Sequence, residues 1–299
     1  MIDAGQSRPS FFHWVFYGPA ELRAGWRLLM FVAVIFFLTY ATNLLVRPLL
    51  HGASEATFFL VHESMSFLIF LLASWSMGGI EGRTLSDYGL PWRKMFGVQF
   101  WQGVVLGFAS ITVLLLAMRM VGVFSFGSLA LHGADIWKWA LIYVLAFILV
   151  ALREEFGTRG YGLFTLSAGI GFWPAAIVSA VIFGYAHHGN SGEDWIGLFN
   201  VAGFGLLACL LLRRTGNLWM PIGLHAAFDW GETYFYGVAN SGHSWPGHLL
   251  NSSSSGPAWL SGGTVGPEGS VLLTVLMIVT WLLCARWLPE VKYPRPSRA

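Results

Sequence analysis

Long apolar runs, separated by short polar segments, extend along most of the chain. Eight of these runs are long enough, or nearly so, to cross the hydrocarbon core of a bilayer, which takes about 20 helical residues. They predict an all-α, polytopic membrane protein with about eight transmembrane helices, forming a single integral membrane domain over residues 1–299. The predicted spans are Trp26–Val46, Thr57–Ile80, Trp101–Phe124, Trp137 to about Leu166, Trp173–His187, Trp195–Leu212, Leu218–Tyr236 and Ser270–Trp287.

The composition supports this membrane assignment. Of the 299 residues, 56% are hydrophobic and only 11% are charged, whereas a soluble domain has about 25% charged residues. The formal net charge of +2 is too small to indicate a nucleic-acid partner. Both cysteines, Cys209 and Cys284, lie within apolar runs, where we interpret them as small apolar side chains and not as a disulfide framework.

Basic residues gather at alternate ends of the predicted spans. The loop 238–269 contains neither Lys nor Arg, and it is rich in Ser and Gly. Under the positive-inside rule, this pattern predicts that both termini are cytoplasmic and that the loop 238–269 lies on the opposite side. The basic residues on the predicted cytoplasmic side are Arg8, Arg23, Arg27, Arg83, Arg93, Lys94, Arg213, Arg214, Arg286, Lys292, Arg295 and Arg298.

Three groups of ionisable residues interrupt the apolar runs of the second half of the chain, within residues 153–160, 183–188 and 216–229. Charges at bilayer depth cost several kcal/mol, so they are candidates for function. A helix rises about 1.5 Å per residue, which places Glu154 and Asp229 about 18 Å, His187 about 21 Å and His225 about 12 Å from the cytoplasmic face. The estimate for Glu154 assumes that its helix continues to Leu166. At these similar depths, the three groups can meet.

Helical spacing adds detail to these groups. Glu155 and Arg159 are four residues apart and are predicted to form an ion pair within the membrane. Glu154 points about 100° away from Glu155 and is free for chemistry. His225 and Asp229 are also four residues apart and are predicted to face one cavity. Small residues that would allow close helix approach around the site are Gly157, Gly160, Gly162, Gly184 and Gly223.

Other interpretations of the single groups exist. A pair of glutamates at a helix end is often a solvated cap, and a histidine in a membrane helix often serves a helix–helix hydrogen bond. We assign His62, Glu63 and His188 mainly structural or solvent-facing roles, and Asp229 could be interfacial. The occurrence of all three groups together, at similar depths, favours a functional site.

These residue types suit peptide hydrolysis. The reaction needs an activated water and donors for the developing oxyanion. Glu154 is the candidate general base, His187 would orient the water or bind a metal, and His225 would stabilise the oxyanion. An ionised Asp229 cannot donate a hydrogen bond, so it would orient His225, ligate a metal or act while protonated. Glu154, His187 and His225 are also the ligand types of a catalytic zinc site, and the sequence leaves open whether the cofactor is a single Zn²⁺ or none.

At these residues the chain resembles the CAAX protease and bacteriocin-processing (CPBP, or Abi) family of intramembrane proteases. The family motif EExxxR corresponds to residues 154–159, FxxxH to Phe183–His187, and HxxxN or HxxxD to His225–Asp229. The resembling core runs from about residue 137 to residue 230. Each motif alone is weak, whereas three in the expected order are specific.

The resemblance implies a fold and an activity. Eight helices would surround an intramembrane cavity open to the cytoplasm, and the activity would be that of an endopeptidase, labelled in some members a metalloprotease. By family similarity, Glu154 activates water with His187, while His225 and Asp229 form the oxyanion side, supported by Glu155 and Arg159. The expected partners are the lipid bilayer and a peptide or protein substrate that is membrane-associated or lipid-modified. The short loops resemble those of bacterial members, which implies a bacterial inner membrane.

Two other functions are compatible with the sequence. A non-catalytic membrane scaffold or immunity protein would keep the fold and bind a partner. A proton-coupled carrier would use the same glutamates and histidines as a relay at mid-membrane. No inverted repeat is visible, and a scaffold has no need of Glu154, His187 and His225, so we favour the peptidase.

Overall fold

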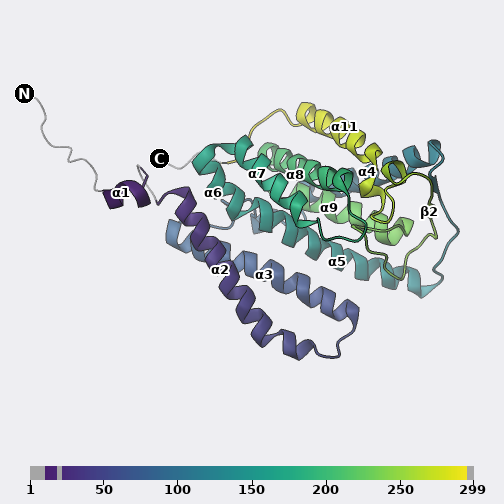
Figure 1. Cartoon of the computed structure of the whole chain (residues 1–299), viewed down its shortest axis with the longest axis horizontal. Helices are drawn as coiled ribbons and strands as arrows, with labels where there is room; N and C mark the ends of the chain where they lie inside the picture. The colour runs from purple at the N-terminus through teal and green to yellow at the C-terminus, as the bar shows by residue number, and fades with distance from the viewer. Residues whose placement is uncertain (1–10, 19–21, 295–299) are drawn as a thin grey trace, which may run out of the picture.

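The protein is an almost entirely helical bundle, seen in the computed structural model, which describes residues 11–18 and 22–294 (Figure 1). The larger helices are α2 (Ala24–Leu45), α3 (Glu55–Glu81), α4 (Val98–Met120), α5 (Ala134–Arg159), α6 (Tyr161–Ile170), α7 (Phe172–Ala186), α8 (Trp195–Thr215), α9 (Trp219–Trp230) and α11 (Val271–Trp287). Shorter helical elements are α1 (Phe11–Phe16), η1 (Arg47–Leu50), η2 (Trp92–Lys94), the π-helix η3 (Gly231–Tyr236), α10 (Ala258–Ser261) and η4 (Pro267–Gly269). The predicted fold class, an all-α polytopic membrane protein, is confirmed.

Every predicted span overlaps a helix of the bundle. Within the described part of the chain, five helical stretches are long and apolar enough to cross a membrane, namely α2, α3, α4, α5 together with α6, and α8. Helices α7 and α11 are apolar but shorter, so the total of eight spans stays a prediction. Three basic residues used for the orientation, Arg8, Arg295 and Arg298, lie outside the described residues. The cytoplasmic placement of the termini also stays a prediction.

The fourth predicted span was wrong as a single helix, because it is broken at Gly160. Helix α5 ends at Arg159, and α6 begins at Tyr161 and runs in another direction (Figure 1). Gly160 has a ψ of −120°, which no helix allows, and a methyl group there would lie 2.4 Å from the carbonyl oxygen of Phe156. Hydropathy does not register such a break, since α6 is as apolar as α5.

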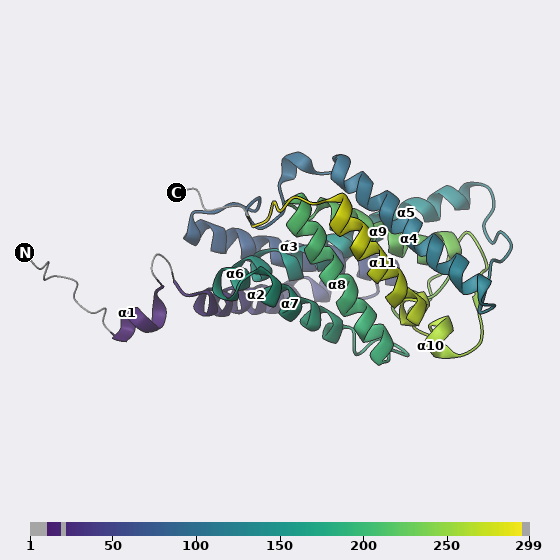
Figure 2. The ribbon, with the colours of Figure 1, turned by 90° about the horizontal axis from the view of Figure 1, so that it is seen from above.

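Helix α9 lies in the centre of the bundle and α2 at its edge. All residues of α9 from Trp219 to Asp229 are buried, and α9 packs against α4, α5 and α8. By contrast, only Arg27 and Phe31 are buried in α2, which packs on α3 and α6. Helices α2 and α3 form one edge in Figure 1, and α11 lies toward the other; Figure 2 shows α8 and α11 next to each other. The apolar outer face of α2 therefore suits contact with lipid.

Glycines bring α9 into backbone contact with α4. A methyl group on Gly223 would lie 2.2 Å from the carbonyl oxygen of Phe100, and one on Gly107 would lie 2.1 Å from that of Leu224. Gly103 faces the carbonyl oxygen of Met220 in the same way. Small residues allow such approach between membrane helices. The helix that carries His225 and Asp229 is thus fixed against α4 along its first two turns.

The other glycines predicted at helix contacts divide into two groups. Gly184 lies against α8 at Leu198 and Ala202, and Gly157 lies against the ring of Phe70, as expected. For Gly162 the prediction was wrong, because a methyl group there would have no heavy atom within 4 Å. It follows the break at Gly160 and faces open space.

The loop 238–269 is joined to the α4–α5 connection by a short antiparallel ladder. Strand β1 (Phe124–Ser125) pairs with β2 (Ser253–Ser254), and Leu129 forms a further bridge with Leu250. The serine run 252–255 of this loop supplies β2. This ladder and the Leu129–Leu250 bridge attach the middle of the loop to the segment that joins α4 to α5.

Candidate active site

The four predicted catalytic residues, Glu154, His187, His225 and Asp229, line one cavity of about 300 Å³. Glu154 lies near the C-terminal end of α5, and His187 caps the C-terminus of α7. His225 and Asp229 lie on successive turns of α9. The structure therefore brings together three helices that are separate in the sequence.

One carboxylate oxygen of Glu154 faces both imidazoles. Its Oε2 lies 3.7 Å from Nε2 of His225 and 4.0 Å from Nε2 of His187. These separations are too long for direct hydrogen bonds, and a gap of this size between polar groups suits a bridging water. The other oxygen, Oε1, accepts a hydrogen bond of 2.5 Å from Arg153, so Glu154 was not as free as the sequence predicted.

The ring of His187 is oriented by its own helix. Its Nδ1 lies 2.8 Å from the carbonyl oxygen of Phe183, one turn earlier. Since a carbonyl oxygen can only accept a hydrogen bond, Nδ1 must carry the proton. The Nε2 atom of a neutral His187 is then an acceptor that faces Glu154. The FxxxH spacing produces this contact between His187 and Phe183, because residues four apart stand one above the other on a helix.

The ring of His225 is oriented by a carboxylate. Its Nδ1 lies 2.9 Å from Oε1 of Glu155, and Glu155 also pairs with Arg159. An ion-paired carboxylate is an acceptor only, so Nδ1 of His225 is the donor. Its Nε2 faces Glu154 and lies 3.5 Å from Oδ2 of Asp229. The predicted shared cavity of His225 and Asp229 is confirmed.

The predicted ion pair between Glu155 and Arg159 is confirmed and is entirely buried. Arg159 Nη1 lies 2.9 Å from Glu155 Oε2, and both side chains have 0% exposure. The guanidinium also lies 4.5 Å from the ring centroid of Phe183 and donates to the carbonyl oxygen of Gly205. A buried pair with such additional contacts fixes geometry, since removal of either partner would leave an uncompensated charge. This pair therefore supports both imidazoles, His225 directly and His187 through Phe183.

A second ion pair at the site was missed by the sequence analysis. Arg153 forms an ion pair with Glu63 of α3 and with Glu154. Glu63 had been assigned a structural or solvent-facing role; it is buried and lines the cavity, so the solvent-facing alternative was wrong. His62 and His188 are exposed, as expected. Glu63 and Arg153 lie on different helices, and only their common membrane depth could have indicated the pair.

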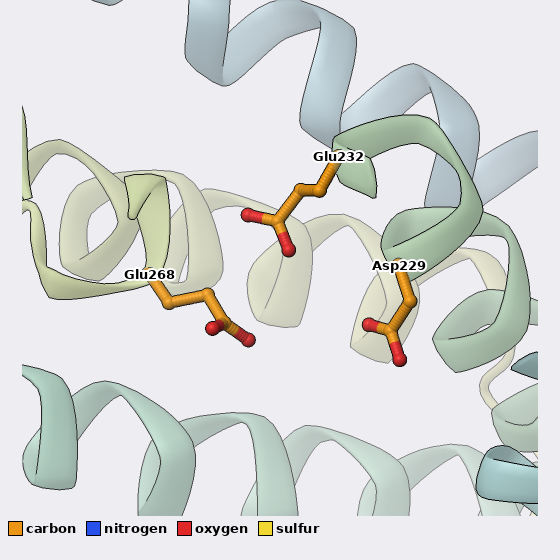
Figure 3. A group of neighbouring side chains, drawn as sticks. All are labelled: Asp229, Glu232 and Glu268. Atoms are coloured by element: carbon orange, nitrogen blue, oxygen red, sulfur yellow. The ribbon is translucent and has the colours of Figure 1, made fainter. Parts of the chain in front are cut away.

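Two more acids, the buried Glu232 and the half-buried Glu268, lie next to Asp229 and were also missed. Glu232 is one turn further along the same helical stretch, in η3, and Glu268 belongs to η4 (Figure 3). Glu268 accepts hydrogen bonds from the backbone N–H and hydroxyl of Ser241. Burial raises the pKa of Glu268, and the two Ser241 donors oppose that shift. The spacing of Asp229 and Glu232 within one predicted span was the available signal.

The fit of a zinc ion to the predicted ligands is poor. Zinc ligands stand about 2.0–2.2 Å from the ion, which places the ligand atoms of a tetrahedral site about 3.3–3.6 Å apart. Glu154 Oε2 and the two Nε2 atoms are 3.7 and 4.0 Å apart, and Arg153 occupies Oε1. Within residues 11–18 and 22–294, the group whose ligand atoms all lie within 4.8 Å of one another is Asp229, Glu232 and Glu268. We therefore derive no reaction step through zinc.

The cavity wall includes loop residues as well as helices. Ser241, His243 and Trp245 of the loop 238–269 line it, together with Asn190, which follows α7. Asn200 of α8 donates to the carbonyl oxygens of Glu268 and Ser270, at 2.8 and 2.9 Å, and so fixes η4 beside the site. The cavity thus lies between the catalytic candidates and the loop that contains no basic residue.

Comparison with known proteins supports the resemblance. Residues 136–231 match the family model of type II CAAX prenyl endopeptidase Rce1-like proteins, a segment that contains Glu154, His187, His225 and Asp229. The match covers less than half of the chain and confirms the predicted similarity to CAAX-type intramembrane proteases. Neither the curated proteins nor the solved structures gave a match. Together with the apolar helices, the family match indicates an integral membrane protein of the peptidase class.

Proposed function

We propose that this protein is an intramembrane endopeptidase in which Glu154 activates a water molecule for attack on a peptide bond. The observation that carries the proposal is the position of Glu154 Oε2, which faces the Nε2 atoms of two histidines at 3.7 and 4.0 Å. Both rings are oriented through their Nδ1 atoms. A general base and two oriented imidazoles around one gap meet the requirements of metal-free hydrolysis.

The reaction proceeds in two steps. Water held between Glu154 and Nε2 of His187 gives a proton to Glu154 while its oxygen attacks the carbonyl carbon of the substrate. The carbonyl electron pair moves to oxygen, and the oxyanion accepts a hydrogen bond from Nε2–H of His225, which is cationic beside Glu154, Glu155 and Asp229. Glu154 then returns the proton to the amide nitrogen as the C–N bond breaks, which yields a carboxylic acid and an amine. Asp229 orients His225.

The proposed substrate is a peptide or protein segment with a lipid modification. A second cavity of about 310 Å³ adjoins the site, between α3, α5 and the loop 238–269. Phe59, Phe147 and Trp245 line both cavities, and the second one is otherwise mainly apolar. Such a surface suits a hydrocarbon chain, which would hold the attached peptide beside Glu154.

The side from which substrate enters depends on the orientation of the loop 238–269. The family resemblance implies a cavity open to the cytoplasm, whereas the distribution of Lys and Arg predicts the opposite side for this loop. A cysteine introduced at the exposed Ser244 would distinguish these predictions by labelling of intact cells with an impermeant reagent, because both native cysteines are buried. The bacterial inner membrane stays a prediction as well.

Cleavage of a fluorogenic peptide library by purified variants tests the proposed function. Glu154→Gln and His187→Ala are each expected to lower kcat/KM by at least about 100-fold, since Glu154 takes the proton of the attacking water and His187 holds that water in place. The matched control is His188→Ala, which changes the exposed neighbouring histidine and should leave activity near that of the wild type. Melting temperatures of all variants would show that the losses are not due to unfolding.

Several outcomes would contradict the proposal. Turnover at the wild-type rate in Glu154→Gln would exclude Glu154 as the base. Stoichiometric zinc in the purified protein, lost with His225→Ala and required for activity, would replace the metal-free reaction by a metallopeptidase. No cleavage by the folded wild type, with Glu154-dependent proton flux in proteoliposomes, would instead support a carrier.

A further inference from the structure

Three acidic side chains outside the Glu154–His187 gap converge on one small space; two of them are buried and the third, Glu268, is half-buried. Asp229 is in α9, Glu232 is three residues later in η3, and Glu268 comes from η4 in the loop 238–269. One carboxylate oxygen from each lies within 4.8 Å of the others. Figure 3 shows the three carboxylates directed toward the same space from two separate parts of the chain.

Glu232 is the member of this acidic trio (Asp229, Glu232 and Glu268) that most requires an explanation. It has 0% exposure, and neither of its carboxylate oxygens has a hydrogen-bond partner among the described residues. Its side chain extends into the space between Asp229 and Glu268 (Figure 3). A buried, unpartnered carboxylate is strongly disfavoured unless a proton or a cation compensates it.

The neighbouring groups supply little compensation to the trio. Glu268 has the two hydrogen bonds from Ser241, which carry no charge. Asp229 lies 3.5 Å from His225, whose ring already faces Glu154 and Glu155. The imidazole of His187 also acts on Glu268, and it already faces Glu154. Three carboxylates therefore share two imidazoles with Glu154 and Glu155. A negative site of this kind attracts a small, multiply charged cation.

From this arrangement, we propose that Asp229, Glu232 and Glu268 form a binding site for a divalent cation of the Ca²⁺ type. All three donors are oxygens, the ligands of hard cations, and soft sulfur ligands are absent from the trio. Ca²⁺ binds oxygens at about 2.3–2.6 Å, so two of its ligands can stand up to about 5 Å apart. The separations within 4.8 Å meet this limit, and Ca²⁺ accepts flexible coordination by protein oxygens, whereas Mg²⁺ demands near-ideal octahedral geometry and usually keeps several waters.

The bound ion would join the loop 238–269 to the catalytic helix. Asp229 and Glu232 belong to one continuous helical stretch, and Glu268 is held by Ser241 and Asn200 at the other side of the space. Coordination of all three would fix η4 against α9 and close that wall of the cavity. The loop is predicted to lie outside the cytoplasm, where Ca²⁺ sites commonly have a Kd of about 10⁻⁴–10⁻³ M. This site does not depend on the proposed peptide hydrolysis.

Equilibrium binding of radioactive Ca²⁺ to the full-length protein in detergent tests the site. After removal of divalent ions with EGTA, we expect one Ca²⁺ per chain, with Mg²⁺ competing weakly. Glu232→Gln and Glu268→Gln should each lower the affinity at least ten-fold. The control Glu290→Gln changes an exposed carboxylate near the C-terminus, of 73% exposure, and should bind as the wild type does. Melting temperatures in EGTA would verify that each variant is folded.

The results separate the acidic trio from the catalytic group. Glu154→Gln is expected to retain Ca²⁺ binding while it loses peptidase activity, so failure of either proposal can be recognised separately. Absence of Ca²⁺ binding at millimolar concentration would overturn the site. Wild-type affinity in folded Glu232→Gln and Glu268→Gln, or loss of binding only in Glu154→Gln, would overturn it as well.

Discussion

The two acidic groups of the membrane interior are neutralised in different ways. Around Glu154 and Glu155, each carboxylate has a guanidinium within 3 Å, from Arg153 and Arg159 respectively. Around Glu232, no hydrogen-bond donor approaches either oxygen among the described residues. Each group contains a fully buried glutamate, Glu155 or Glu232, and both groups lie on the same cavity or beside it.

The difference is therefore in the source of the counter-charge. The chain itself supplies it for the Glu154–Glu155 group and does not supply it for the acidic trio. Desolvation penalises a buried carboxylate in either place, and only a counter-charge or a proton offsets it. The Glu154–Glu155 group contains its own counter-charges one and four residues away on α5. The acidic trio combines a helix with a distant loop and depends on something from outside. A bound cation is the simplest complement that its geometry accepts.

The same substitution at two fully buried glutamates gives the largest expected contrast. Glu155→Gln would leave Arg159 as an uncompensated charge and should lower the free energy of unfolding by about 3–5 kcal/mol. Glu232→Gln, measured in EGTA, should lower it by far less or raise it, because it removes an unpaired charge. Denaturant titration of both variants in detergent provides the measurement. Equal losses of unfolding free energy in the two variants would contradict the contrast between a paired Glu155 and an unpaired Glu232.

Addition of Ca²⁺ to the wild type should affect stability next most strongly. A ligand present at 100 times its Kd raises the free energy of unfolding by about 2.7 kcal/mol when it binds only the folded state. Thermal unfolding with and without Ca²⁺ would measure this gain, and Glu232→Gln, with a Kd at least ten times higher, should show at most about 1.4 kcal/mol, half of it. An equal gain in that variant would mean that Ca²⁺ stabilises the protein elsewhere.

The smallest effect is expected at Glu63. Arg153 is 28% exposed and keeps Glu154 as a partner when Glu63 is neutralised, so Glu63→Gln should cost only about 0–1 kcal/mol. Glu55→Gln, an exposed position on the same helix, is the matched control for the unfolding measurement. A loss above about 3 kcal/mol would place Glu63 among the uncompensated-charge cases such as Glu155.

Much of the fold followed from the sequence because apolar run length is a direct consequence of bilayer thickness. The eight predicted windows overlap the helices of the bundle, and their ends differ mostly by a few residues. The break at Gly160 could not be predicted, since it depends on backbone angles between two equally apolar segments. The ladder between β1 and β2 depends on pairing between distant loops, which no local pattern in either loop specifies.

The candidate site was predictable where its contacts are local. Glu155–Arg159 and His225–Asp229 are four residues apart, and helical geometry alone brings each pair together. Glu63–Arg153 and Glu232–Glu268 join residues from different elements, so neither pair has a spacing that reveals it. The catalytic roles of Glu154, His187, His225 and Asp229 stay predictions until the variants are assayed.

The glycine contacts between α4 and α9 have a consequence for engineering substrate choice. Because Gly103, Gly107 and Gly223 have no room for even one methyl group, a mutational library along that seam would consist mainly of misfolded members. The opposite wall, where α3 presents Phe59 and Glu63 to the cavity, packs through side chains and has room to vary. Selection for new substrate specificity should therefore yield substitutions in α3, while the glycines between α4 and α9 stay unchanged.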